Sequence, residues 1–284
     1  MASGGRGTAD LAGREHARHF ARKTDAQRWL DDVTASVITG TYVSPRTART
    51  TVSEWCETWL AGYATRRPST VRQARVHARQ IIAEFGAMPL SAVRPSHVKS
   101  WTSRLRAEHL SASYVYALHA RLAQLFADAV HDGIVPRSPC SRRTSPGAGK
   151  QRPYCATTAQ VWALLGAMPE RLRAAVLLGA FAGLRVAEAC GLRAADVDFM
   201  RGVITPAVQF PAEELKTEIS RTPVPVPRSL ALELAAHVER WPSGGGSLLT
   251  GADGGQLSTW ALERAMRAAR AKVPGLPAGF RYHA

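Results

Sequence analysis

The stretch from Gly183 to Phe199 holds the first residues whose types and spacing could do chemistry. An apolar run at residues 174–178 leads to Gly183, where glycine tolerates backbone angles that end a helix. Arg185 follows at the start of the next short helix, and Glu188 comes three residues later, so both can share one helical face. A guanidinium held there suits a phosphate group. The alternative is a helix hairpin with an exposed arginine and an internal Arg–Glu pair, and this stretch alone leaves both open.

Two later stretches carry further candidate groups. Residues 215–227 read LKTEISRTPVPVP and contain Lys216 and Arg221, and residues 280–283 read FRYH and end at His283. Taken alone, Lys216 is an ordinary solvated lysine of a hairpin, and His283, one residue from the last position, has no evident role. Only the joint order of the three stretches makes these residues candidates.

In this order and at about these separations, the three stretches resemble the catalytic domain of the tyrosine recombinases, the phage integrase family, and in particular the phage-type integrases of actinobacteria. The family pattern is a G-L-R-x-x-E box, a lysine on a β-hairpin followed by an S-R-x-V-P-type strand, and an H-x-x-R box. The resemblance covers most of the chain, and three ordered matches are far more specific than one.

The resemblance implies DNA strand exchange without ATP, metal or any other cofactor. In the family a tyrosine attacks the scissile phosphodiester, forms a 3′-phosphotyrosyl bond and frees a 5′-hydroxyl, so covalent catalysis conserves the bond energy. Arg185 matches an arginine that stabilises charge on the non-bridging oxygens, and Lys216 matches the lysine that protonates the leaving oxygen. His283 matches the histidine of the box, a donor to the phosphate, and Glu188 is expected to orient its neighbours.

The sequence departs from the family pattern after His283. The box should continue to a second arginine, then to a second histidine or tryptophan, and then to helices that bear the nucleophilic tyrosine. Tyr282 is not a candidate, because it lies beside the box histidine rather than after the later motifs. We therefore expect a catalytic domain truncated before its nucleophile and inactive in this form, either a remnant of an integrase reading frame or a fragment of a longer protein.

Composition favours a polyanionic partner. The chain carries 37 Lys and Arg against 22 Asp and Glu, a net charge of +15. Counterion release from double-stranded DNA, here attachment-type sites, would supply much of the affinity for such a chain. The alternative is a basic surface that follows from GC-rich coding. Family members assemble as homo-tetramers on DNA by exchanging C-terminal segments, which the given sequence does not include, so it does not itself predict a tetramer.

The sequence also limits the classes of protein to which this chain can belong. Its four cysteines show no metal-ligand spacing, so no zinc site is predicted, and their scatter suits a reducing cytosol. No apolar run approaches the length of a membrane helix, and the N-terminus has no signal-peptide core. We therefore expect a bacterial cytoplasmic protein, associated with the nucleoid and not with a membrane.

Residues 1–48 are predicted to be an N-terminal leader that forms a partial arm-type DNA-binding module. A helix opens near Thr24 or Asp25, and Trp29, Val33 and Val37 follow at helical spacing. This helix resembles the last helix of the small module found at the N-terminus of many phage integrases. The strands that usually precede that helix are not recognisable, so a simple helical leader stays open as the alternative.

Residues 49–138 are predicted to form a compact helical domain of four helices, with Ser69 as the N-cap of the second. This unit resembles the core-binding, SAM-like domain of the family, which clamps one face of duplex DNA. Arg72, Arg75 and Arg79 fall at helical spacing and form a basic stripe. We expect phosphate contacts from these arginines rather than sequence readout. The alternative is an ordinary solvated helix face.

Residues 139–153 read as a basic linker rich in Pro, Ser and Gly, and residues 154–284 as the truncated catalytic domain. Residues 203–210 and 222–226 are the predicted strands, with Lys216 on their connection and Arg221 as a further DNA-binding candidate. The predicted fold is mainly α with a small antiparallel β-sheet: a helical core-binding (SAM-like) domain plus a truncated α+β DNA breaking–rejoining domain.

Overall fold

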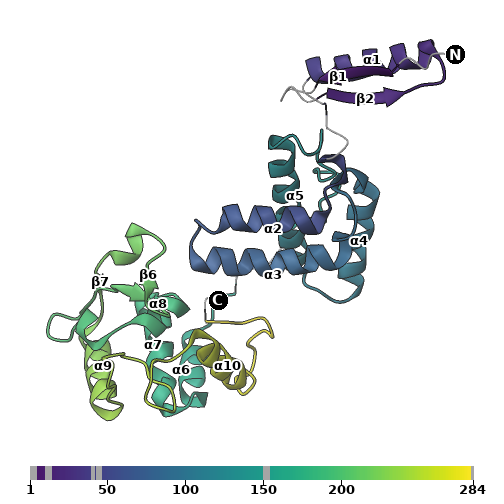
Figure 1. Ribbon diagram of the computed structural model, residues 1–284. Coiled ribbons are helices and arrows are strands. Elements are labelled where there is room, and N and C mark those ends of the chain that lie inside the picture. The colour runs from purple at the N-terminus through teal and green to yellow at the C-terminus, as the bar shows by residue number, and fades with distance from the viewer. Residues whose placement is uncertain (1–4, 10–14, 40–41, 43–46, 150–153, 283–284) are drawn as a thin grey trace. The chain divides into compact units, whose positions relative to one another are not determined.

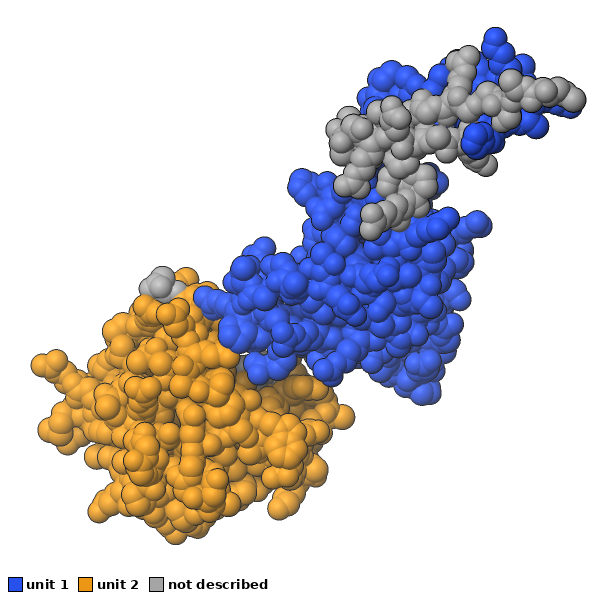
Figure 2. Space-filling model, viewed as in Figure 1, with its two compact units in different colours: residues 1–150 blue, residues 151–284 orange. Residues whose placement is uncertain are grey.

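The computed structural model describes residues 5–9, 15–39, 42, 47–149 and 154–282. The chain divides into two compact units, residues 1–150 and residues 151–284, shown in different colours in Figure 2. Each unit encloses a hydrophobic core of its own. Over the described residues, none of the helices combines the length and the apolar character needed to cross a bilayer.

The first unit opens with a β-hairpin and a helix. Strands β1 (Gly5–Ala9) and β2 (Glu15–His19) pair antiparallel, and helix α1 (Lys23–Ile38) contacts β1 (Figure 1). These two strands precede the helix, although they were not recognisable in the sequence. The strand residues are mostly Gly, Arg, His and Ala, without the alternating β-branched pattern that marks a strand in sequence, so the pairing rests on backbone hydrogen bonds.

Four helices form the core of the first unit: α2 (Val52–Tyr63), α3 (Pro68–Phe85), α4 (Pro95–Ala107) and α5 (Ala112–His131). Short 3₁₀ turns η1 (Thr47–Arg49) and η2 (Leu90–Ala92) flank α2 and α4. Helix α5 supplies much of the core, with Leu118, Leu122, Leu125 and Phe126 fully buried. The four-helix unit predicted from sequence is confirmed.

The starts of these helices follow known capping chemistry. The Thr51 hydroxyl caps α2 while the Glu54 carboxylate accepts from the Thr51 backbone N–H, the reciprocal pair called a capping box. Helix α3 begins two residues earlier than predicted, at Pro68, with Arg67 as N-cap, so the assignment of Ser69 was wrong. Proline suits the first helical position because its φ is fixed and its missing N–H would have no partner there.

The segment after α5 lies against the first unit at least as far as Thr144. The Thr144 side chain is buried, and its hydroxyl lies 3.0 Å from Nε2 of the buried His119. Burial lowers the pKa of His119, so its imidazole stays neutral near pH 7. The part of the predicted linker up to Thr144 is therefore packed rather than free.

The second unit is built from helices α6 (Thr158–Ala167), α7 (Arg173–Ala182), α8 (Val186–Gly191), α9 (Arg228–Arg240) and α10 (Thr259–Arg270), with 3₁₀ turns η3 (Glu170–Leu172), η4 (Ala194–Asp196) and η5 (Glu218–Arg221). Helix α7 contacts α6, α8 and α9, so it lies at the centre of the unit. Leu178 of α7 and Leu234 of α9 are both fully buried.

Two small antiparallel sheets complete the second unit. Strands β3 (Val197–Asp198), β4 (Val203–Ile204) and β7 (Val224–Pro225) form one, in the order β3-β4-β7, and β5 (Val208–Gln209) pairs with β6 (Glu213–Glu214) in the other. The single strand predicted over residues 203–210 is therefore split. Pro206 lies at the split and has no N–H for a ladder. The mainly α class with small antiparallel sheets is confirmed.

Candidate active site

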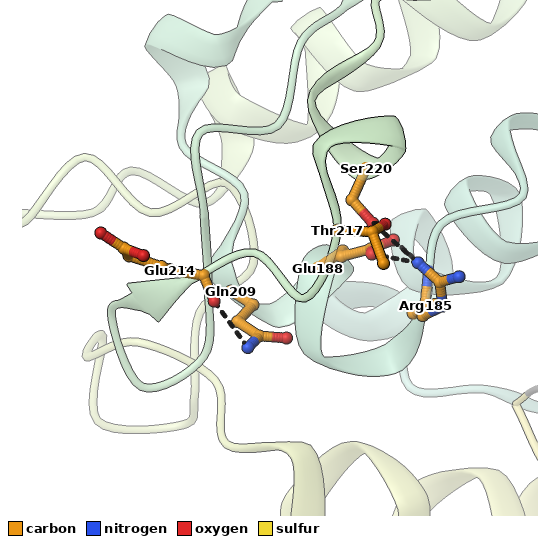
Figure 3. Close-up of polar contacts among 6 residues, drawn as sticks. All are labelled: Arg185, Glu188, Gln209, Glu214, Thr217 and Ser220. Atoms are coloured by element: carbon orange, nitrogen blue, oxygen red, sulfur yellow. Dashed lines mark hydrogen bonds and ion pairs between the residues drawn. The ribbon is translucent and has the colours of Figure 1, made fainter. Parts of the chain in front are cut away.

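Arg185 lies at the junction of α7 and α8. Helix α7 ends at Gly183, whose φ of 64° is left-handed, and the chain turns so that Arg185 becomes the N-cap of α8. Its backbone N–H donates to Oε2 of Glu188 at 2.9 Å, and its Nη1 donates to Oε1 of the same carboxylate at 2.8 Å (Figure 3). The two residues that the sequence paired are therefore joined by two hydrogen bonds.

Glu188 is a buried, ionised carboxylate. Burial by itself raises the pKa of Glu188, but the hydrogen bonds from the Arg185 backbone, the Arg185 guanidinium and Ser220 outweigh it, so the pKa lies below its ordinary value. The side chain of Glu188 is 6% exposed, while that of Arg185 is 54% exposed. A fixed negative charge thus holds one edge of the guanidinium, and the rest of the group faces solvent.

The β5–β6 hairpin is docked directly on α8. The Phe210 N–H donates to the Ala187 carbonyl at 2.7 Å, and a Cβ atom added at Gly191 would lie 2.7 Å from the backbone of Gln209 and Phe210. No side chain other than hydrogen fits at that position without moving the backbone. Gln209 is buried, and its amide donates to the Glu214 carbonyl at 2.8 Å (Figure 3). The hairpin is thereby fixed relative to Arg185.

The segment after β6, which contains Lys216, is hydrogen-bonded to this arginine through Ser220. Leu215 is buried, Lys216 is exposed, and η5 follows. The Ser220 hydroxyl accepts from Arg185 Nη1 at 2.8 Å, and the Thr217 hydroxyl lies 3.2 Å from the Ser220 hydroxyl (Figure 3). Lys216 lies after the β5–β6 hairpin and before β7, so it is on the connection between the two predicted strand segments, as expected.

Sequence reasoning missed Ser220, Thr217 and Gly191 as parts of this site. Ser220 was in view as the first letter of an S-R-x-V-P-type strand, but it and the exposed Arg221 lie in η5, and the strand begins only at Val224. No local pattern could indicate that a hydroxyl in this segment would reach an arginine 35 residues earlier. His283 lies outside the described residues.

Tyr282 is part of the core. Its hydroxyl donates to the Ala175 carbonyl at 2.8 Å, and only 9% of the residue is exposed. The ring packs where Gly179 has no side chain, since a Cβ there would lie 3.0 Å from the ring carbon that bears the hydroxyl. Burial raises the pKa of Tyr282, which disfavours the phenolate. This environment does not suit a nucleophile.

A family model described as "Phage integrase, N-terminal SAM-like domain" matches residues 51–106. The putative prophage phiRv2 integrase of Mycobacterium tuberculosis (strain H37Rv) is 23% identical over 238 residues, which cover 78% of this chain and 62% of that protein. A XerC-like tyrosine recombinase of Caldanaerobacter subterraneus subsp. tengcongensis is 25% identical over 222 residues, covering 67% and 56%. This chain is related to the phage-integrase tyrosine recombinases. It spans less than two thirds of the length of these two curated relatives.

Two solved integrases share the fold. The Tn1549 transposon integrase in complex with transposon right end DNA matches with a TM-score of 0.70 and 18% identity, over 82% of this chain and 83% of that chain. A lambda integrase dimer bound to a COC′ core site matches with a TM-score of 0.66 and 17% identity, over 99% of this chain and 82% of that chain. The second match leaves almost no residue uncovered, so it extends to the N-terminal hairpin and α1.

The predicted arginine stripe lies within the residues that match the SAM-like model, and its side chains are exposed. Arg72, Arg75 and Arg79 project from α3 and, with Arg66, line a groove of about 540 Å³. None of the ion pairs within the described residues involves the three arginines of the stripe. Unpaired guanidinium groups along a groove are available to an anionic ligand.

An aromatic cluster that the sequence did not indicate lies between α2 and α5. The Tyr63 ring stacks on Trp59 with centroids 4.4 Å apart, and the Tyr63 hydroxyl accepts from Arg121 Nη1 at 2.9 Å. The Arg121 guanidinium lies 5.2 Å from the Tyr63 ring centroid, and that of Arg66 lies 5.9 Å from it. Cation–π contacts thus hold Arg66, at the start of the groove, close to the helical core.

Proposed function

We propose that this protein acts in site-specific DNA recombination and integration, breaking and rejoining double-stranded DNA at attachment-type sites through a phosphotyrosine intermediate. The observation that carries the proposal is a half-exposed guanidinium, Arg185, fixed by a buried carboxylate and joined to the Lys216 segment. On this proposal the protein works on DNA in the bacterial cytoplasm, at the nucleoid. The relationship to integrases supports it.

In the proposed reaction Arg185 binds the non-bridging oxygens of the scissile phosphate. As the bond from the tyrosine oxygen to phosphorus forms, the bond to the 5′-oxygen breaks, and negative charge collects on the oxygens that Arg185 faces. Glu188 does not react, because it is bonded to the arginine and serves to orient it. A guanidinium suits this role because it stays charged and offers two parallel donors.

Lys216 supplies a proton to the departing 5′-oxygen in this scheme, which leaves a free 5′-hydroxyl. In the reverse step the 5′-hydroxyl of the partner strand attacks the phosphotyrosine and its proton returns to the lysine. The tyrosine leaves as the phenolate, the form in which it attacked in the first step. His283 matches the box histidine that donates to the phosphate. These roles need neither a metal nor a nucleotide.

Arg72, Arg75 and Arg79 contact DNA phosphates in the proposed complex, and Arg221 adds a contact from the second unit. Such contacts position a protein on duplex DNA without reading its sequence. The recombining complex would be a homo-tetramer on two duplexes, because strand exchange joins two cleaved sites.

A second candidate function is DNA binding without cleavage, in which the chain occupies an attachment-type site. The arginine-lined groove of the first unit supports this candidate, because exposed guanidinium groups can bind phosphates without any covalent step. The exposed arginine stripe would serve both functions equally.

A suicide-substrate assay separates the two functions. The purified chain is incubated with nicked attachment-type DNA and scored for a covalent protein–DNA band, and in parallel for a salt-dependent gel shift. A covalent band that is lost in Arg185→Ala and Lys216→Ala, with DNA affinity kept within about threefold, supports recombination. A shift without a covalent band supports binding alone. A covalent band that persists in both variants would contradict the assigned roles.

A further inference from the structure

Lys216 lies between two points at which its segment is held. On one side Leu215 is buried, with 3% of its surface exposed. On the other side the Thr217 hydroxyl lies 3.2 Å from the Ser220 hydroxyl, which accepts from Arg185 Nη1 at 2.8 Å. The backbone of an exposed lysine is therefore restrained on both sides, although the lysine itself is solvated.

Ser220 is bonded to a group that is already fixed. Both oxygens of the buried Glu188 accept from Arg185, and the Ser220 hydroxyl is hydrogen-bonded to Glu188 as well as to the guanidinium. A serine hydroxyl can accept and donate at once, so it can join a cation and a carboxylate. Both side-chain bonds of Arg185 use Nη1, and within the described residues Nη2 makes no hydrogen bond.

We propose that Ser220 is a positioning residue, whose hydroxyl ties the Lys216 segment to Arg185 so that the lysine and the arginine serve one phosphate. That the target is a DNA phosphate rests on the proposed function. The tie itself is a feature of the protein without DNA. Nη2 of Arg185 remains for a phosphate oxygen while Nη1 holds the segment.

The tie is tested on the full chain with a lysine-specific endoproteinase. The sequence has five lysines, and cleavage after Lys216 gives a distinct fragment. Ser220→Ala should speed cleavage after Lys216 by about fivefold, because loss of a hydrogen bond to a charged group raises the population of the open segment that the protease cleaves. Cleavage after Lys99 in α4 should keep its rate, which shows that the fold is intact.

Three further variants make the test specific. Ser220→Thr keeps a hydroxyl and should restore the original rate. Arg185→Ala removes the other partner, so the double variant Arg185→Ala/Ser220→Ala should cleave no faster than the faster single variant. Ser229→Ala, an exposed serine at the start of α9, is the matched control and should not change the rate.

The inference is overturned if Ser220→Ala is cleaved after Lys216 at the original rate, if Ser220→Thr is cleaved as fast as the alanine variant, or if the effects of the two single variants multiply. The proposed function is judged separately, by adding attachment-type DNA to the unsubstituted chain. Protection of Lys216 by DNA supports a phosphate near the lysine. If DNA gives no gel shift and no protection while the Ser220 effect holds, the proposed function fails and the tie stands.

Discussion

At the scale of single residues, the geometry of the candidate site depends on Glu188. A carboxylate that is 6% exposed would ordinarily resist ionisation, yet two bonds from Arg185 and one from Ser220 keep it charged. Its charge in turn fixes the arginine before any phosphate arrives. The site is thus preorganised by one buried anion rather than by the fit of its ligand.

Glu188 should make the stability of the second unit depend on pH. The folded pKa lies below the ordinary value of 4.5, so the carboxylate contributes stability that is present above about pH 4.5 and is lost as the pH falls through the folded pKa. Glu188→Gln should lower the free energy of unfolding at pH 7 by about 1 kcal/mol, a modest loss because Arg185 is half-exposed and screened by water.

Urea unfolding at pH 7 and pH 3 measures this effect, and the difference between the variant and the original chain should shrink at pH 3. Glu239→Gln is the control, since Glu239 is an exposed carboxylate on α9. A constant difference at both pH values would mean that the charge of Glu188 has no part in holding Arg185.

At the scale of elements, the β5–β6 hairpin packs closely against α8, and this contact fixes the position of the segment that follows, which contains Lys216. Gly191→Ala should lower the free energy of unfolding by about 2 kcal/mol, because the added Cβ would meet the backbone rather than a movable side chain. The Phe210 amide, which donates to Ala187, should also exchange its hydrogen faster. Denaturant unfolding and hydrogen exchange measure the two effects.

The matched control for this substitution is Gly166→Ala. Gly166 lies in α6, and no heavy atom comes within 4 Å of the Cβ that would be added. Alanine should be neutral or stabilising there by up to about 1 kcal/mol, because glycine is a poor helix former. Equal effects at both positions would show that the hairpin does not need the close contact at Gly191.

Helix α3 should control how DNA affinity depends on salt. If its three stripe arginines each neutralise one phosphate, the triple variant Arg72→Ala/Arg75→Ala/Arg79→Ala should reduce the slope of log affinity against log salt by about 3. Gel shifts across a salt series give the slope. Arg201→Ala, in the second unit and paired with Asp198, is the control. An unchanged slope in the triple variant would identify the stripe as a solvated face.

The helices could be predicted from sequence and much of the site could not, for a physical reason. Helices such as α5 carry a long repeat of core residues, so their periodicity locates them within one or two residues. Strands β5 and β6 have only two residues each. Their hairpin is held by contacts with α8, an element far from it in the sequence. Arg185 and Glu188 could be paired because they are three residues apart, whereas the link to Ser220 depends on the tertiary fold.

At the scale of the whole molecule, the chain has two separate cores. Leu122 is fully buried in the first and Leu234 in the second. Units with their own cores can unfold in separate steps. Leu122→Ala should lower the stability of one unfolding transition by about 2–5 kcal/mol, and Leu234→Ala that of the other. Calorimetry checks this, and a single transition that both variants shift equally would contradict it.

The packing of Tyr282 against Gly179 also constrains how the sequence can drift. The two positions are far apart in the chain, yet a Cβ at 179 would lie 3.0 Å from the phenol ring. A mutation that adds a side chain at 179 therefore forces the ring at 282 to shift, and we expect it to be better tolerated where a smaller residue stands at 282. Among descendants of this gene the two positions should covary, with glycine at 179 wherever an aromatic ring is kept at 282.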